Sequence, residues 1–213
     1  PQNIPLTPVT NTTLLVNGTN AGVYDSSVMN NYETVGDAKI DTTVVKFAGT
    51  NSVKFDGNGD YLVTPPSMTY AYLWTGNLTV ECWVYFSSVA NAPHIWSIGE
   101  SNTARCTLYV LGNVLKFYTV VGAGDNRITS STTLATGQWY HVAITKSNGV
   151  FTLWLNGVSQ GTSNTTVFPS GLAETVAIGF QNYGGQSGDY FNGYISDFRI
   201  TQGIARYTTN FTP

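Results

Sequence analysis

The stretch that decides the fold is Gly137–Val158, which reads Gly-Gln-Trp-Tyr-His-Val-Ala-Ile-Thr-Lys-Ser-Asn-Gly-Val-Phe-Thr-Leu-Trp-Leu-Asn-Gly-Val. Two runs of alternating residues flank Asn148 and Gly149. Asn-Gly between such runs indicates a β-hairpin, because both residues tolerate positive φ. Alternate apolar side chains in each run share one face. A hairpin of two strands cannot bury that face alone, so the sequence predicts a second layer and hence a β-sandwich.

The rest of the chain repeats this pattern of short apolar runs separated by turn residues. No window shows a sustained helical period, so we predict an all-β protein. Residues 17–41 are expected to form a long surface loop, and residues 122–127, 161–171 and 181–190 to connect strands. Besides the hairpin, strands are predicted at residues 12–16, 44–47, 52–55, 61–63, 78–86, 94–99, 106–111, 114–121, 175–180 and 194–200.

The composition predicts a single domain with a neutral, polar surface. A chain of 213 residues buries roughly 70% of its unfolded surface, enough for a core without metals or disulfides as staples. Charged residues make up 10% of the chain, against about 25% in typical soluble proteins. The net charge is -3 and the nine Lys and Arg residues form no basic stripe, so nucleic acid is not an expected partner. No apolar run approaches the ~18 residues of a membrane span, so membrane insertion is not expected either.

The two cysteines, Cys82 and Cys106, lie at apolar positions of strand-like runs. Buried free thiols are favoured over a disulfide, because a core of this size needs no covalent staple. The disulfide stays open as the alternative, and the thiols indicate no redox compartment.

An ordered set of short motifs resembles the laminin-G-like jelly rolls of the concanavalin-A-like lectin and glucanase superfamily. No single motif is specific, but their order and spacing match the family. The resemblance implies a two-sheet antiparallel jelly-roll sandwich over residues 13–201. We expect a Pro-rich linker or docking arm at residues 1–12, and a tail at residues 202–213 that packs back through Tyr207 and Phe211. The matching motifs are residues 55–62, 78–85, 138–143, 155–157 and 191–200.

Residues 199–213 are similar to the version of this module found in large proteins of tailed bacteriophages. This similarity implies a non-enzymatic module on the virion surface, either a capsid decoration or part of a tail or fibre, with glycan adhesion as its activity. Its partners would be other virion proteins or copies of itself, together with a host-surface or environmental glycan. The alternative is an extracellular carbohydrate-binding module of a cellular adhesin or of a polysaccharide-degrading enzyme.

The sequence offers no catalytic residues. Glycoside hydrolysis needs two carboxyl groups about 5 to 9.5 Å apart, whereas the strand at 78–86 carries Glu81 alone and no other strand carries an acidic pair at that spacing. The only two histidines, His94 and His141, lie in strand-like runs, and His141 belongs to a structural motif of the resembled family. A nucleophilic triad and a zinc site are therefore not expected.

Two loops combine the groups that glycan binding requires. Sugar recognition uses planar side chains and neutral hydrogen-bonding groups, and the loops at one end of a sandwich are where such groups converge. Loops 122–127 and 181–190 have this composition, although solvated Gly-rich loops without a ligand remain the alternative. The candidate glycan-binding residues are Asp125, Asn126, Arg127, Asn182, Tyr183, Gln186, Asp189 and Tyr190.

A structural calcium ion is a further expectation that comes from the resemblance. Superfamily members often hold calcium through carboxylates of an early loop and of the last strand, and those positions map to Asp25 and Asp197. The acidic turn that contains Asp56 and Asp60 is not an EF-hand, because Tyr61 occupies the position where that loop requires Gly. Turn capping by Asx hydrogen bonds is the favoured interpretation of Asp56 and Asp60.

Overall fold

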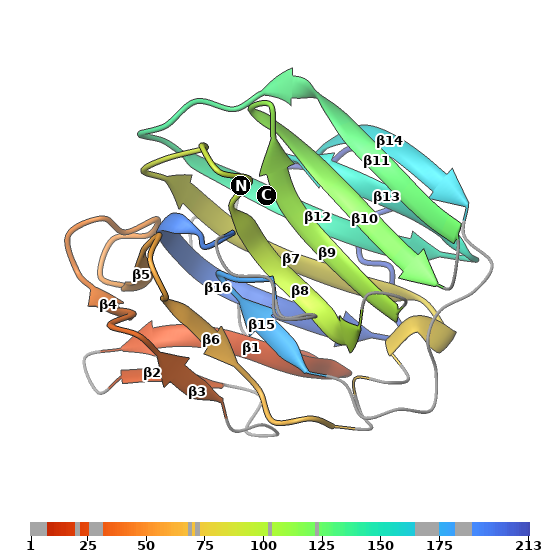
Figure 1. Cartoon of the computed structure of the whole chain (residues 1–213). Helices are drawn as coiled ribbons and strands as arrows, with labels where there is room; N and C mark the ends of the chain where they lie inside the picture. Colours follow the sequence, from red (N-terminus) through yellow and green to blue (C-terminus); the bar gives the residue numbers. More distant parts are fainter. Residues whose placement is uncertain are drawn as a thin grey trace.

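The protein is a sandwich of two antiparallel sheets in a computed structural model, with the seven-stranded sheet packed across the nine-stranded one (Figure 1). The all-β, two-sheet antiparallel prediction is confirmed. The short 3-10 turn Leu73–Thr75 interrupts the strands. The structure describes residues 8–19, 22–25, 32–67, 70, 73–101, 104–121, 124–164, 175–181 and 189–213.

The nine-stranded sheet is built around the predicted hairpin and β7, its antiparallel neighbour. Its main path ends at β1 and β2, while β5 pairs with β16 and β4 pairs with β5. The strands in order along the main path are β14 (Val158–Asn164), β13 (Val150–Leu155), β12 (Trp139–Ser147), β7 (Leu78–Phe86), β16 (Asn192–Gln202), β1 (Thr12–Thr19) and β2 (Gly22–Asp25), with β5 (Ser52–Asp56) and β4 (Lys39–Asp41) off this path.

The seven-stranded sheet combines strands from all parts of the chain. Segments far apart in sequence lie next to each other in it, because β15 pairs with β8 on one side and β6 on the other. The strands in spatial order are β11 (Gly124–Thr133), β10 (Val114–Val121), β9 (Ala104–Leu111), β8 (His94–Ser101), β15 (Val176–Ile178), β6 (Tyr61–Val63) and β3 (Glu33–Val35).

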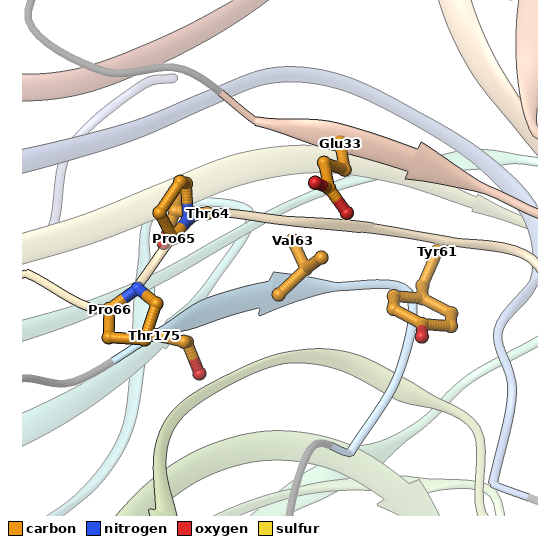
Figure 2. A pocket seen from close by; sticks show the side chains of 7 residues that line it. All are labelled: Glu33, Tyr61, Val63, Thr64, Pro65, Pro66 and Thr175. Carbon is orange, nitrogen blue, oxygen red and sulfur yellow. The ribbon is translucent and has the colours of Figure 1, made fainter.

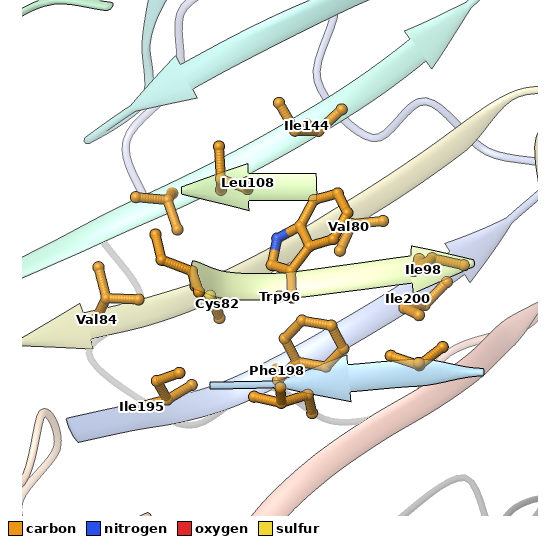
Figure 3. Close-up of a cluster of buried hydrophobic side chains, with 14 of the residues drawn as sticks. Val80, Cys82, Val84, Trp96, Ile98, Leu108, Ile144, Ile195, Phe198 and Ile200 are labelled. Atoms are coloured by element: carbon orange, nitrogen blue, oxygen red, sulfur yellow. The ribbon is translucent and has the colours of Figure 1, made fainter. Parts of the chain in front are cut away.

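The core lies between the sheets and takes alternate side chains from each strand. In β7, Val80, Cys82 and Val84 point inward, against Trp96 and Ile98 of β8 (Figure 3). Burying an aliphatic or aromatic side chain of this kind stabilises the fold by about 1.5 to 3 kcal/mol. Cys82 and its fellow Cys106 are both buried and free, which confirms the prediction of free thiols.

The hairpin that decides the fold has the predicted geometry. Ser147 pairs with Val150 across a two-residue turn, in which Asn148 and Gly149 have φ values of 49° and 85°. Positive φ at both central positions is the type I′ arrangement, whose twist matches that of the flanking strands.

Four details of the predicted strand map are wrong. Residues 44–47 do not form a strand, because the Asp41 carboxylate accepts hydrogen bonds from the backbone N–H groups of Thr43 and Val44 and closes a turn instead. The expected loop 17–41 contains three short strands, β2, β3 and β4, which find partners at sheet edges.

The other two errors concern predicted connections. Residues 124–127 belong to β11 rather than to a loop, because they pair with residues 118–121 of β10. Residues 161–164 belong to β14, which pairs with β13. In both places the sequence is polar because the strand lies at a sheet edge, where one flank meets solvent.

The C-terminal tail lies over the outer face of the nine-stranded sheet. The Tyr207 and Phe211 rings stack with centroids 3.5 Å apart and planes within 4°. Phe211 also makes edge contacts with His141 and Trp154, and its backbone N–H donates to the carbonyl of Gly157.

The segment expected as an N-terminal arm begins in residues 1–7, which lie outside the described residues. None of the helical turns in the described residues is long and apolar enough to cross a bilayer.

Candidate functional site

Three aromatic rings stack on the outer face of the seven-stranded sheet. Tyr61 points outward because its neighbour Leu62 is in the core. Its ring stacks on Phe180 with centroids 4.9 Å apart, and Phe180 stacks on Tyr190 at 4.7 Å. All three side chains are partly exposed. This set, called the Tyr61 stack below, presents planar apolar surface to solvent.

A pocket of about 380 Å³ adjoins the Tyr61 stack. Figure 2 shows the Tyr61 ring at one end of the pocket and Pro65 and Pro66 at the other, with the Glu33 carboxylate reaching over β6 from β3. This volume falls in the range of about 300 to 1,000 Å³ that is typical of small-molecule sites. The lining combines apolar rings, hydroxyl groups and one carboxylate, and consists of Glu33, Tyr61, Val63, Thr64, Pro65, Pro66 and Thr175.

Hydrogen bonds between strands fix the wall of this pocket. The backbone N–H of Thr64 donates to the carbonyl of Val176 at 3.0 Å, and the N–H of Val176 donates to the Thr64 hydroxyl oxygen at 2.9 Å. β6 and β15 are therefore locked together where the pocket opens. A wall of this kind is largely formed before any ligand arrives, which reduces the ordering cost of binding.

His94 and Tyr109 form a separate stacked pair that is connected to the Tyr61 stack through the His94 backbone. The N–H of His94 donates to the carbonyl of Asp189 at 3.1 Å, which ties the residue before Tyr190 to β8. The His94 ring stacks on Tyr109 at 4.9 Å and 7°. Burial lowers the pKa of His94 to about 3, so the imidazole is neutral at physiological pH. Its Nδ1 is buried and has no partner among the described residues.

The structure places the predicted glycan-binding residues in different parts of the molecule. Asp189 and Tyr190 lie at the Tyr61 stack. Asn182, Tyr183 and Gln186 lie outside the described residues. Asp125, Asn126 and Arg127 lie on β11, at the opposite edge of the sheet from β6 and β3, five strand steps or roughly 24 Å away from β6. Among the described residues of the two predicted loops, Asp125, Asn126 and Arg127 therefore lie apart from Asp189 and Tyr190.

Sequence reasoning missed Tyr61 and Phe180. Tyr61 lies in a short predicted strand, next to the apolar Leu62. Because neighbouring residues of a strand point to opposite faces, an inward Leu62 would have indicated an outward Tyr61. Phe180 lies two residues after β15, and its contact with Tyr61 depends on the pairing of β15 with β6, more than one hundred residues earlier in the chain. That pairing is a long-range event that no local pattern encodes.

Glu81 occupies a sealed site on the outer face of the nine-stranded sheet. Its carboxylate is fully buried and accepts bonds from Arg199 Nη2 at 2.6 Å and the Tyr207 hydroxyl at 2.6 Å. His141 Nε2 lies 3.2 Å away, and Arg206 Nε lies 3.6 Å away. Burial by itself would raise the pKa of Glu81, but the hydrogen bond with His141 and the charge on Arg199 lower it to about 2.

Such a carboxylate is a poor general acid. It stays ionised at any physiological pH, and no solvent or substrate reaches it beneath the tail. The arrangement is instead a buried ion network that joins β7, β12, β16 and the C-terminal tail.

Asp37, Asp56 and Asp60 form an acidic cluster, with ligand atoms within 4.8 Å of one another. The Asp60 carboxylate accepts from the backbone N–H groups of Asp37 at 2.7 Å and Asp56 at 3.0 Å. The Asp56 carboxylate accepts from the N–H of Asn58 at 2.6 Å. This confirms the interpretation of Asp56 and Asp60 as turn-capping residues.

The expected calcium residues come from strands that are near neighbours. Asp25 of β2 pairs with Val16 of β1, which in turn pairs with Phe198, the residue after Asp197 in β16. Asp197 is 4% exposed and has a φ of 53°, a conformation that Asp adopts more readily than most residues. The side chain of Asp25 lies outside what the structure describes, so calcium binding at this pair stays a prediction.

A family model described as the concanavalin A-like lectin/glucanases superfamily matches residues 56–204. A comparison with curated protein sequences finds no match. Among solved structures, the chain is similar to domain 4 of AbnA, a GH43 extracellular arabinanase from Geobacillus stearothermophilus, in complex with arabinotriose. The identity is 17% and the TM-score 0.73, over 91% of this chain and 93% of that one.

The chain is also similar to parts of botulinum neurotoxin. A type C structure, described with cell entry that depends on two ganglioside molecules, matches at 15% identity and a TM-score of 0.70, over 90% of this chain and 47% of that chain. The binding domain of neurotoxin DC in complex with SialylT matches at 16% identity and a TM-score of 0.69, over 90% and 48%. The chain thus spans about half the length of these toxin chains.

Proposed function

This chain belongs to the concanavalin A-like lectin/glucanase superfamily, and we propose that it is a glycan-binding module whose site is the Tyr61 stack with its adjoining pocket. The observation that carries the proposal is the stack of Tyr61, Phe180 and Tyr190, whose three rings stay partly exposed and whose Tyr61 also lines the pocket. The exposed parts of such aromatic rings offer apolar surface for the C–H faces of sugar rings.

The polar groups around the stack suit a neutral glycan. The hydroxyl groups of Thr64 and Thr175, which line the pocket with Tyr61, are uncharged hydrogen-bonding groups. Glu33 adds one carboxylate, which accepts hydrogen bonds from sugar hydroxyl groups and disfavours an anionic ligand. The similar solved structures that contain arabinotriose or SialylT, or that are described with gangliosides, support glycan binding at the level of the fold.

The test is a glycan array followed by calorimetry with arabinotriose and the best array ligand. We expect Tyr61→Ala and Tyr190→Ala each to lower affinity by about tenfold or more, since truncated aromatic anchors in binding sites commonly cost this much. Tyr194→Ala, on the other sheet, is the matched control and should leave this binding unchanged. A blank array, or wild-type affinity in both site variants, would overturn the proposal.

The setting of the module is also a proposal. The similarity of residues 199–213 to phage modules supports a non-enzymatic role on a virion surface, and the extracellular carbohydrate-binding module of an adhesin or degradative enzyme is the alternative. The flanking domains of the parent protein separate them. Trimeric fibre repeats or a capsid-docking domain support the virion role, and a catalytic domain next door contradicts it.

Calcium at Asp25 and Asp197 is proposed as a structural cofactor. The strand register that brings residue 25 close to residue 198 supports it. Calcium chloride should raise the melting temperature of the wild-type protein and EDTA should lower it, because a ligand that binds only the native state stabilises that state. An unchanged melting temperature under both conditions, or an identical calcium shift in Asp197→Asn, would remove the site.

A further inference from the structure

Charge is distributed unevenly along the chain. All nine Lys and Arg residues lie outside residues 1–38, 55–104 and 147–198, whereas ten of the twelve Asp and Glu residues lie within these three stretches. The same stretches contain β3, β6 and β15, the strands that carry or adjoin the lining of the pocket beside the Tyr61 stack. The strands at this site therefore supply acidic groups and no cation.

The Glu33 carboxylate is the charged group closest to the stack. The pairing of β3 with β6 places Glu33 opposite Val63 and Val35 opposite Tyr61. Glu33 and Tyr61 are thus diagonal neighbours on one face of the sheet, with Cα atoms roughly 7 to 8 Å apart. Glu33 is exposed, and its carboxylate reaches over β6 into the pocket (Figure 2). Neither a hydrogen bond nor an ion pair joins this carboxylate to any residue that the structure describes.

Asp189 brings a second carboxyl group to the stack. It directly precedes Tyr190, and its backbone carbonyl accepts the hydrogen bond from the His94 N–H. Burial raises the pKa of Asp189, and no nearby cation lowers it. Two carboxyl groups that lack a counter-charge among the described residues therefore accompany the aromatic rings.

The basic residues nearest to the pocket are engaged elsewhere. Across the seven-stranded sheet the first is Arg105 on β9, three strand steps or roughly 14 Å from β6. Its guanidinium carbon lies 5.4 Å from the ring centroid of Tyr118 on β10, one strand farther from the pocket. On the other sheet, the Lys39 ammonium lies 4.0 Å from the Asp37 carboxylate. Charge is balanced there, whereas the pocket stays negative and attracts a cation.

We propose that the Tyr61 stack and its pocket select a glycan that carries free amino groups, with a sugar ring against Tyr61 and its ammonium group at Glu33. This inference rests on the proposed glycan-binding function and names the ligand class of that site. An amino sugar combines an apolar C–H face with a positive charge on one ring, which matches aromatic surface beside an unpaired carboxylate. Cations are also attracted to the faces of aromatic rings, so the stack adds to the selection.

The experiment compares two probes that differ only in their N-acetyl groups: a β-1,4-linked glucosamine oligomer and the N-acetylglucosamine oligomer of equal length. Calorimetry is done at mildly acidic pH, where sugar amino groups are protonated and exposed carboxyl groups are ionised. We expect the wild-type protein to bind the glucosamine oligomer about fivefold more tightly, the upper end for one exposed ion pair. This preference should shrink as salt rises, because exposed charges are screened.

Variants separate the charge at the pocket from the overall charge of the protein. Glu33→Gln should lower the affinity for the glucosamine oligomer to that for the N-acetylated one, whose binding should not change. Asp41→Asn is the matched control, because it removes the same charge from a partly exposed position on β4 of the other sheet. It should leave the preference intact, and Tyr61→Ala should weaken the binding of both oligomers.

The outcomes distinguish this inference from the proposed function. If neither oligomer binds but the glycan array yields another ligand, the selection of amino sugars alone is wrong; a blank array removes the proposed function as well. Equal binding of both oligomers by the wild type, or a preference that survives in Glu33→Gln, also overturns the selection. So does oligolysine that binds as tightly as the glucosamine oligomer, since charge alone would then explain the binding. Glu33→Gln alters one exposed side chain, so the variant should fold and the test stays decisive.

Discussion

Glu81 and Tyr85 lie four residues apart on the same face of β7, yet their surroundings are opposite. Glu81 is fully buried under the C-terminal tail and holds an ion network together. Tyr85 is partly exposed and belongs to an open aromatic row. One strand face is therefore divided into a sealed half and an open half. The division comes from what covers the sheet, because the strand itself continues unbroken.

The covers are supplied by distant segments. Residues 204–213 cover the Glu81 end, where the hydroxyl of Thr79 donates to the carbonyl of Ile204 and the backbone N–H of Arg206 donates to the Thr79 hydroxyl. Between the two halves, Phe47 packs edge-on against Trp83 at 5.9 Å. Beyond Trp83, the side chain of Tyr85 is partly exposed. Sealed positions contribute to stability, and open positions are available for binding.

The largest expected effect comes from breaking the ion network in the sealed half. Glu81→Ala removes the carboxylate that binds the buried Arg199 guanidinium, so we expect it to destabilise the protein by about 3 to 5 kcal/mol. Tyr85→Ala, on the open half of the same strand, should cost only about 1 kcal/mol. Urea denaturation of both variants measures the difference. Equal losses would contradict the division of the face.

Acid should weaken the sealed half next. The pKa of Glu81 is lowered from 4.5 to about 2 in the folded protein, so its ionised form contributes stability above pH 4.5 that is lost as the pH falls toward 2. The full contribution is roughly 3 kcal/mol. The stability of Glu81→Gln should accordingly change less than that of the wild type over this range, as measured by urea midpoints at successive pH values. Parallel curves would argue against a paired, ionised Glu81.

Lifting the tail should have an intermediate effect. Gly157 has a φ of 78°, and a Cβ at this position would collide with the backbone carbonyl of Phe211. We expect Gly157→Ala to destabilise the protein by about 2 kcal/mol and to speed hydrogen exchange in residues 204–213. Gly149→Ala is the control, since Gly149 has a similar φ of 85° with nothing within 4 Å of the added Cβ. It should show backbone strain alone, of about 1 kcal/mol.

The smallest effect is expected in the open half. Replacing Lys39 and Lys54 together by Gln removes a repulsion between directly opposed charges, so stability should stay the same or rise by a few tenths of a kcal/mol. Thermal melts at low and high salt measure it, and the gain should vanish at high salt because exposed charges are screened. A marked loss of stability would mean that these lysines support the fold.

Much of the fold could be predicted from local pattern. The hairpin at Asn148 and Gly149, the strand at 78–86 and the strand at 114–121 follow from alternation and turn chemistry, both of which act over a few residues. The same alternation predicts that the Cys82 side chain faces the core. The short edge strands β2, β3 and β4 could not be predicted this way, because they exist only through partners elsewhere in the chain.

The candidate site was only partly predictable. Tyr190 was identified from loop composition, but its partners Tyr61 and Phe180 were not, and the β11 residues predicted beside it lie across the sheet. The composition of a loop identifies residues whose side chains suit a ligand. It does not predict which of these residues are neighbours in the folded protein.

The sequence by itself determined the class of the fold and the side of each long strand that faces the core, since both depend on residues close together in the chain. The tertiary structure decided that Glu81 is sealed while Tyr85 is open, and that Tyr61 joins Tyr190. It also aligned Trp139 with Lys39 across five strands. The physical reason is that strand order and coverage are set by pairings between distant segments, and a side chain becomes framework or binding surface according to what those pairings place over it.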